Sequence, residues 1–323
     1  MQKRGEFDLL MKYRPRSFTA TAILGCSVAL QSIALSQSQP QSAGAGQPML
    51  FQPMAGGTKA NYQAEFTHSF RSDLNRGDQS VGDFSASRFG LDYSRLFTSS
   101  ETYTWGIGAG WDYAYFDLPT GVPVPDSFQS TYLRLSNQWR FADQWSLRTD
   151  LRPGIYSDFQ DISGGDLNVP FTVILAYDYS SSLTFVAGLN FNYQSDVPFI
   201  GGPGVIWRFA EGWQLRAVLP KPQLTYSPNQ EWMFFVGGEL RGITARVAED
   251  FGKAYNTRAL NDDNLSYREI RVGAGARYRF HRLFHVTVEG GYAIDRRFQY
   301  EDANLLLNGD GAPYVQVSIN GSY

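Results

Sequence analysis

The feature that most constrains the fold is a two-residue period in the side chains from about residue 59 onward. In segment 103–115, Tyr103, Trp105, Trp111 and Tyr113 alternate with small or polar residues. Successive residues of a β-strand point to opposite faces, so this segment predicts a strand with one aromatic and one polar face. A helix would instead repeat its apolar residues every three or four positions.

The same alternation recurs in most later segments, and the face opposite the apolar residues carries arginines and carboxylates. Arg134, for example, lies between Leu133 and Leu135. A membrane barrel turns its apolar face to lipid and keeps charge and water inside. A soluble barrel with so many Trp and Tyr rings inside would need a very wide core. The pattern therefore predicts an all-β chain that forms an antiparallel transmembrane β-barrel over residues 59–323.

Short connections flanked by aromatic residues alternate with longer polar loops, as in outer-membrane barrels. If both chain ends lie on one side of the membrane, the number of strands is even. The count is about 14 if residues 213–219 and 222–226 form separate strands. These two segments are shorter than the roughly 9–11 residues of a membrane-crossing strand. A barrel of 12 strands, with this region folded otherwise, is the alternative.

The first 36 residues have the three parts of a secretory signal peptide. Basic residues precede an apolar run from Phe18 to Leu35, and small residues suited to cleavage follow. Met1 and Met11 are both compatible with the start of this signal. A lone transmembrane anchor is the alternative to a signal peptide. It is disfavoured because the apolar run barely reaches the about 20 residues that a transmembrane helix needs.

Residues 37–58 are rich in Gln, Ser, Gly and Pro, and this composition predicts a flexible periplasmic linker. The single cysteine, Cys26, falls within the predicted signal peptide. The exported chain is therefore expected to have no disulfide and no thiolate chemistry.

The chain ends on an aromatic residue that is in register with an apolar face. Val315, Val317, Ile319, Gly321 and Tyr323 alternate with polar residues. A terminal aromatic residue after alternating apolar ones resembles the signal that barrel-assembly machinery recognises. We therefore expect the last strand to close the barrel and to carry this assembly signal.

Composition and motifs argue against several classes of function. Lys and Arg number 28 against 31 Asp and Glu, without a basic run, so no nucleic-acid partner is expected. No serine is placed by sequence to meet His68, His281 or His285, and no motif has the spacing of a metal site. We expect neither an enzyme nor a bound cofactor or metal.

Several segments in the last third of the chain form a recognisable set. They are Pro222-Gln223-Leu224-Thr225-Tyr226, Trp232 with residues 234–240, Val247-Ala248-Glu249-Asp250-Phe251, residues 267–273, and Glu289-Gly290-Gly291-Tyr292. In these segments the chain resembles an uncharacterised outer-membrane barrel family, domain-of-unknown-function family 6268. The resemblance implies a β-barrel in the outer membrane and no particular substrate.

Charged residues on three consecutive predicted strands are the candidate functional site. Alternation directs them into the lumen, where opposite charges on neighbouring strands can pair. They either form a constriction that selects solutes or a salt-bridge network that stiffens the interior. The candidates are Glu239, Arg241, Glu269, Arg271, Arg277, Glu289 and Asp295.

Two functions follow from these expectations. The first is a passive pore or small-solute transporter in the outer membrane of a Gram-negative-type bacterium. The alternative is a closed structural or adhesive barrel without transport activity. Outer-membrane lipid and the barrel-assembly machinery are the expected partners, and the sequence does not indicate an oligomeric state.

Overall fold

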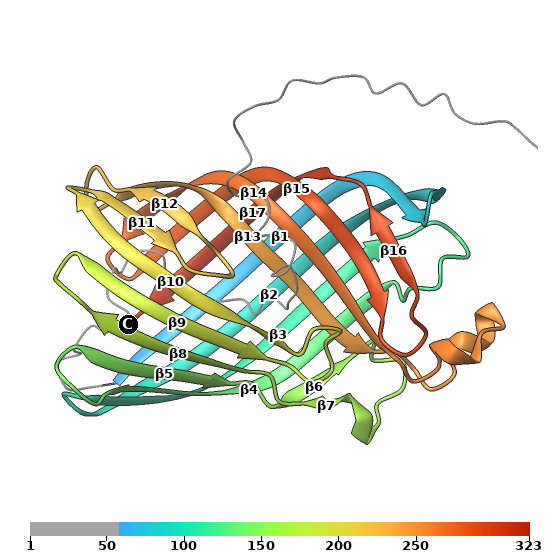
Figure 1. The fold of residues 1–323 in the computed structure, drawn as a ribbon, viewed down its shortest axis with the longest axis horizontal. Coiled ribbons are helices and arrows are strands. Elements are labelled where there is room, and N and C mark those ends of the chain that lie inside the picture. Colours follow the sequence, from blue (N-terminus) through green and yellow to red (C-terminus); the bar gives the residue numbers. More distant parts are fainter. Residues whose placement is uncertain (1–57) are drawn as a thin grey trace, which may run out of the picture. The chain divides into compact units, whose positions relative to one another are not determined.

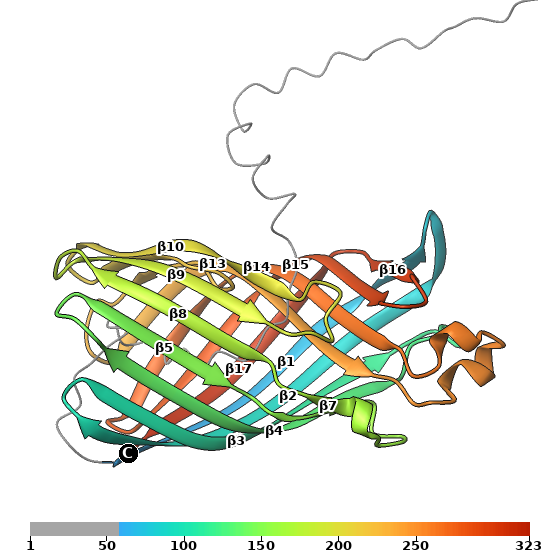
Figure 2. The same cartoon turned by 60° about the horizontal axis from the view of Figure 1, so that its bottom comes forward.

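The computed structural model describes Thr58–Tyr323, and within these residues the chain is a closed antiparallel barrel (Figures 1 and 2). The barrel has 14 strands, so the predicted fold class is confirmed and the alternative of 12 strands is wrong. The predicted signal peptide and, except for Thr58, the predicted linker lie outside the described residues. Between residues 58 and 323, no helix is long and apolar enough to cross a membrane.

Most of the described chain belongs to the barrel wall. Three of the 14 barrel strands are interrupted and carry two labels each: β5 with β6, β7 with β8, and β16 with β17. Pro153 and Pro170 lie at two of these breaks, because proline has no N–H for the ladder. The strands are β1 (Thr58–Arg76), β2 (Gln79–Ser100), β3 (Tyr103–Asp117), β4 (Ser127–Arg140), β5 (Trp145–Leu151), β6 (Gly154–Ser157), β7 (Leu167–Asn168), β8 (Phe171–Asp178), β9 (Leu183–Phe191), β10 (Phe199–Ala210), β11 (Trp213–Ala217), β12 (Gln223–Tyr226), β13 (Trp232–Arg246), β14 (Asn264–His281), β15 (Phe284–Tyr300), β16 (Leu306–Gly309) and β17 (Ala312–Ser322).

The last strand closes the barrel against the first. β17 pairs with β1 from Asn61 opposite Ser322 to Ser69 opposite Tyr314. The ring of Tyr323 stacks on that of Tyr62, with 5.6 Å between the ring centroids. Closure satisfies the backbone groups of both terminal strands, which a membrane interior would otherwise leave unpaired.

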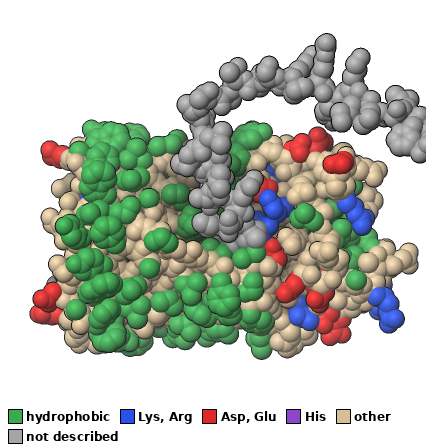
Figure 3. Space-filling model, in the orientation of Figure 1, with side chains coloured by type: hydrophobic (Ala, Val, Ile, Leu, Met, Phe, Trp, Pro, Cys, Tyr) green, Lys and Arg blue, Asp and Glu red, His purple; other side chains and the backbone are tan. Residues whose placement is uncertain are grey.

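Exposed apolar side chains form a belt around the outside of the barrel (Figure 3). At the end with the short turns, aromatic rings pack beside each other, as in Trp139–Phe141 and Trp213–Tyr226. Charged side chains gather toward the other end, which carries the long loops. We call these the short-turn end and the loop end. The aromatic residues that flank the short connections therefore form a girdle at the short-turn end.

An apolar core fills the barrel at its loop end. Phe84, Phe116, Phe128 and Phe298 are its largest fully buried apolar side chains. The loops fold over this core: the hydroxyl of Tyr300 donates to the carbonyl of Pro123 at 2.8 Å. The short helices lie in the loops and are η1 (Gly164–Asp166), η2 (Phe251–Tyr255) and η3 (Arg258–Leu260).

The ring of strands is smaller around this core than at the short-turn end. Ser157 of β6 pairs with Arg246 of β13, although the two strands are far apart in the order of the sheet. This contact closes a smaller ring that leaves out β5, β7 to β12 and β17. The ring consists of β1, β2, β3, β4, β6, β13, β14, β15 and β16.

The two short strands, β11 and β12, do not run the full length of their neighbours β10 and β13. β10 pairs with β11 only from Val205 onward, and β12 pairs with β13 only as far as Gly237. Neither short strand extends between residues 199–204 of β10 and residues 238–246 of β13. The strand ladder of the described residues therefore has a gap toward the loop end. Figure 1 shows β11 and β12 as a small hairpin near the short-turn end.

Replacing Phe298 by alanine should strongly destabilise the barrel, because its ring lies 4.5 Å from that of Tyr267 and 5.0 Å from that of Phe116. A buried Phe→Ala change costs about 3–5 kcal/mol. Phe199→Ala is the control, because Phe199 is 61% exposed on the outside. Urea unfolding in lipid vesicles measures both; equal losses would contradict the assignment of Phe298 to a packed core.

Candidate functional site: the polar lumen

Six of the seven predicted site residues face the lumen. Alternation along β13, β14 and β15 turns these side chains inward, while neighbours such as Val236, Val272 and Val288 are exposed on the outside. The six are Glu239, Arg241, Glu269, Arg271, Arg277 and Glu289.

Asp295 does not belong to this set, and its predicted position was wrong. Asp295 pairs with Ile270, and Ala293 pairs with Arg271, so Ile294 is an extra residue in the ladder. This β-bulge reverses the alternation of β15. Asp295 therefore lies on the outer face with its ion-pair partner Arg297, whose Nε is 3.3 Å from Asp295 Oδ1.

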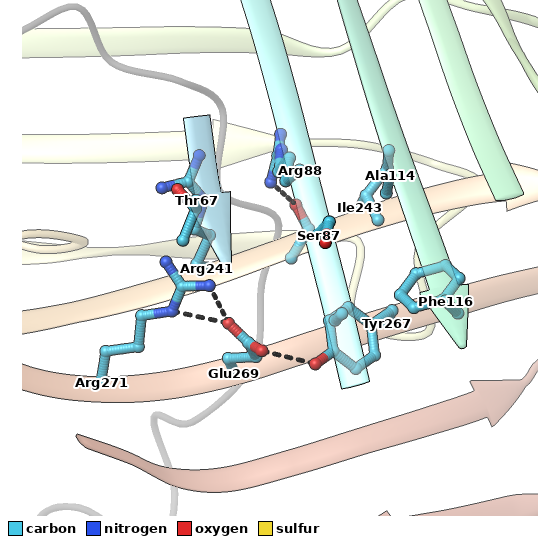
Figure 4. A pocket seen from close by; sticks show the side chains of 12 residues that line it. Thr67, Ser87, Arg88, Ala114, Phe116, Arg241, Ile243, Tyr267, Glu269 and Arg271 are labelled. Atoms are coloured by element: carbon cyan, nitrogen blue, oxygen red, sulfur yellow. Dashed lines mark hydrogen bonds and ion pairs between the residues drawn. The ribbon is translucent and has the colours of Figure 1, made fainter. Parts of the chain in front are cut away.

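The lumen residues of β13 and β14 form ion pairs that cross the interior. Arg241 pairs with Glu65 of β1, and its Nη1 donates to Gln316 Oε1 of β17 at 2.8 Å. Nε of Arg271 donates to Glu269 at 2.6 Å, and the Tyr267 hydroxyl donates to the same carboxylate at 2.5 Å (Figure 4). These contacts join strands that are not all neighbours, so they reduce the open width of the lumen.

A lysine that the sequence prediction missed connects two of the predicted carboxylates. Nζ of Lys221 lies 3.4 Å from Glu239 and 3.1 Å from Glu289. The Tyr314 hydroxyl also donates to Glu289, at 2.6 Å. Lys221 lies in the connection between β11 and β12, a region whose fold the alternation could not predict.

A second ion-pair network joins side chains of β2, β4 and β5 with Arg152, which lies between β5 and β6. Arg134 pairs with Asp92 at 2.8 Å and with Asp150 at 2.6 Å, and Arg152 pairs with Asp150 at 2.9 Å. All four side chains are less than a tenth exposed. Of these four, Arg134 is the residue that the sequence analysis placed opposite the apolar face.

A cavity in the lumen lies next to the apolar core. One part of its wall is apolar, with Ala114, Phe116 and Ile243, and another part is charged, with Arg241 and Arg271 (Figure 4). The cavity is therefore a small space between the apolar core and the ion pairs of the lumen.

Arginines are gathered in the lumen near the short-turn end. Their outward neighbours, such as Trp207 and Phe280, belong to the apolar belt. Asp178 is a lumen carboxylate near the same end of the barrel, and it accepts a hydrogen bond from the Thr184 hydroxyl at 2.7 Å. We call the arginine cluster the arginine rim; it consists of Arg148, Arg208, Arg216, Arg277 and Arg279.

One contact corrects the sequence-based view of the histidines. His68 and Ser87 are opposite each other on β1 and β2, and His68 Nδ1 lies 2.9 Å from Ser87 Oγ. The pair lies on the outer face, away from the polar lumen. Among residues 58–323, no carboxylate accepts a hydrogen bond from Nε2 of His68. The described residues therefore show no third group that would orient the imidazole. The same part of the chain holds no cluster of three metal-binding side chains.

The model of the family described as a domain of unknown function, DUF6268, matches residues 65–308. The chain belongs to this family. The match covers most of the barrel, from β1 to β16, so the DUF6268 region and the barrel described above largely coincide. A search of curated proteins finds no match to this DUF6268 chain.

Several solved barrels have a similar fold. A deletion mutant of the TodX monoaromatic hydrocarbon channel is 9% identical, with 83% of this chain and 91% of that chain covered and a TM-score of 0.46. An outer-membrane channel from Pseudomonas putida F1 is 7% identical, with 84% and 97% covered and a TM-score of 0.46. The KdgM porin is 8% identical, with 81% and 99% covered and a TM-score of 0.35.

The ion pair between Arg241 and Glu65 should show strong coupling in a double-mutant cycle. Arg241→Met leaves Glu65 without its cationic partner in the lumen, and breaking a buried pair costs about 3–5 kcal/mol. Adding Glu65→Gln removes the orphaned charge, so much of the stability should return. Unfolding free energies of the two single variants and the double variant test this; additive losses would show that the two groups are not coupled.

Proposed function

We propose that this protein is a passive channel for small solutes in the outer membrane of a Gram-negative-type bacterium. The observation that carries the proposal is a polar, charged lumen inside an apolar outer belt. A barrel of this kind offers solutes a path through lipid that avoids the hydrocarbon.

The ion pairs favour a narrow, selective path over a wide pore. Arg134, Arg241 and Arg271 each hold a carboxylate of the lumen wall in place. Rings of fixed charges of both signs select solutes by size and charge. Glu239, Arg241, Glu269, Arg271 and Glu289 would then act as the constriction, whereas Asp295 would not.

The chain ends support the proposed location. β17 presents Val315, Val317 and Ile319 on the outer face, and Tyr323 is 63% exposed beside Tyr62. We propose that this strand is the part that the barrel-assembly machinery recognises. The apolar belt would contact outer-membrane lipid.

The arginine rim gives the channel a preference for anions. Anionic solutes that approach from the short-turn end meet several guanidinium groups before they reach the ion-pair networks. A cluster of like charges at a mouth concentrates the opposite ion and repels the like one.

Replacing Arg216 and Arg277 by glutamine should reduce the anion preference of the channel. The matched control is Arg95→Gln, because Arg95 lies in β2 on the outer face, with its guanidinium 5.5 Å from the Phe97 ring. Reversal potentials across a planar bilayer under a salt gradient measure the preference. Solute uptake by vesicles that contain the folded protein should accompany it; if folded wild-type protein gives neither current nor uptake, the channel proposal is wrong.

One observation favours the alternative of a closed structural or adhesive barrel. The apolar core around Phe116 and Phe298 blocks the axis at the loop end. A closed barrel would conduct no ions and take up no solute. A channel with this core requires an opening elsewhere in the wall.

A further inference from the structure

We infer that Arg277 is the centre of a binding site for solutes that carry a carboxylate on an aromatic body. The site lies in the lumen toward the short-turn end, on the inward faces of β13, β14 and β15. This inference rests on the proposed channel function for the passage of the solute, and it names the class of solute. The arginine rim would act on all anions through its field, whereas this site would hold one anion by direct contact.

Arg277 is a buried cation without a carboxylate partner in the described barrel. It is 8% exposed, and its Nε donates to the Thr287 hydroxyl at 3.3 Å. Nη1 of the same guanidinium group is buried and has no hydrogen-bond partner among residues 58–323. The ion pairs between these residues do not include Arg277. Burial of a charge without a counter-charge is costly, so a bound anion would stabilise this guanidinium group.

The other two arginines of the predicted site are compensated. Arg241 pairs with Glu65, and Arg271 pairs with Glu269. All three arginines are less than a tenth exposed, so they share the same degree of burial. Within the part of the chain that the structure describes, Arg277 is therefore the arginine of this set that lacks a counter-charge.

The carboxylate that follows on the neighbouring strand already has partners. Thr287 of β15 is opposite Arg277 in the ladder, and Glu289 is the next inward residue of β15. Glu289 binds Nζ of Lys221 at 3.1 Å and accepts from the Tyr314 hydroxyl at 2.6 Å. This carboxylate is therefore held by other donors, and the anion for Arg277 must come from outside the described chain.

Further polar groups lie on the short-turn side of Arg277. Tyr278 is opposite Val286 in the ladder, so the inward side chains next to this pair, Arg279 and His285, are neighbours. Nε2 of His285 is buried and has no hydrogen-bond partner within residues 58–323. Arg279 is exposed. An anion that enters from the short-turn end would therefore meet Arg279 before it reaches Arg277.

A thioether and an aromatic ring border Arg277 on the side of β13. Met233 is opposite Arg277 in the ladder, and Phe235 is opposite Gly275, which is the preceding inward residue of β14. Phe235 is 7% exposed, and its ring lies where a Cβ added at Gly275 would be. The absence of a side chain at Gly275 therefore makes room for this ring on the face of β14 that carries Arg277.

These neighbours together define the class of solute. A carboxylate can accept hydrogen bonds from a guanidinium group with both of its oxygens. An aromatic body attached to the carboxylate can pack against the ring of Phe235 and the sulfur of Met233. A small inorganic anion would compensate Arg277 but leave the apolar side without a partner. An uncharged aromatic compound would leave the guanidinium group uncompensated.

Binding of para-fluorobenzoate to the barrel in lipid nanodiscs tests the site, with fluorine NMR as the measurement and empty nanodiscs as the blank. Arg277→Gln should raise the dissociation constant by at least about tenfold, because it removes a charge-assisted hydrogen bond. Arg279→Gln is the matched control, since it removes the same charge from the next inward position of β14, where the side chain is exposed. It should change the constant by less than about threefold.

Competition against para-fluorobenzoate tests the aromatic part of the site. Acetate, inorganic phosphate and benzamide should each compete at least about tenfold more weakly than benzoate, because each lacks one of the two contacts. Equal competition by acetate or phosphate would overturn the assigned class of solute.

Stability separates binding from a structural role of Arg277. Without a solute, Arg277→Gln should leave the free energy of unfolding unchanged or raise it, because the variant removes an uncompensated buried charge. Urea unfolding in lipid vesicles measures this. A loss as large as that expected for Arg241→Met would show that Arg277 has a partner within the folded chain, and it would overturn the inference.

The outcomes separate the binding site from the channel function. If folded wild-type protein does not bind para-fluorobenzoate, or if Arg277→Gln binds it equally well, the site is wrong, and bilayer currents still decide on the channel. If the probe binds as expected but the folded protein gives neither current nor uptake, the channel proposal fails and the site stands without transport. Arg277→Met replaces Arg277→Gln if the latter does not give the heat-resistant gel migration of a folded barrel.

Discussion

The structure depends on the requirement that backbone N–H and C=O groups have partners where no water is available. A sheet with free edges cannot meet this requirement in a membrane, whereas a closed ring of strands can. Pairing of β17 with β1 removes the edges at the chain ends, and Tyr62 and Tyr323 stack at that seam. The same requirement explains the contacts around the gap in the strand ladder. Arg88 and Asp158 bind backbone groups of β13 that have no neighbouring strand.

Closure turns the polar faces of all strands toward one another, so charge compensation decides the shape of the lumen. Arg134 with Asp92 and Asp150, and Arg241 with Glu65, bring carboxylates and guanidinium groups together across the interior. Removing one member of such a pair leaves a charge without compensation, which costs more than the pair itself contributes. The networks therefore hold the wall in a defined shape and reduce the open width of the lumen. Under the proposed channel function, the same ion pairs would also form the constriction.

The loop end and the gap follow from unequal strand lengths. β11 and β12 are too short to reach the loop end. One edge of β13 therefore has no neighbouring described strand until β6 meets it at Arg246, while its other edge pairs with β14. The smaller ring that results is filled by Phe84, Phe116, Phe128 and Phe298. The apolar core therefore closes the axis of the barrel at its loop end, beside the gap in the strand ladder.

The sequence alone determined the class of fold, the approximate strand number and the inward position of most charged residues, because a strand alternates its faces with a fixed period of two. This period depends only on local geometry. The prediction based on it was wrong for Asp295, because one extra residue in β15 reverses the faces of the strand. The tertiary structure decided which charges meet. Arg241 pairs with Glu65 from the far end of the chain, and Lys221 enters the network from an irregular connection. Barrel closure and the lengths of the strands set these contacts, the apolar core and the gap in the strand ladder. The alternation of side chains along one strand carries no information about them, because they join segments that are far apart in the sequence.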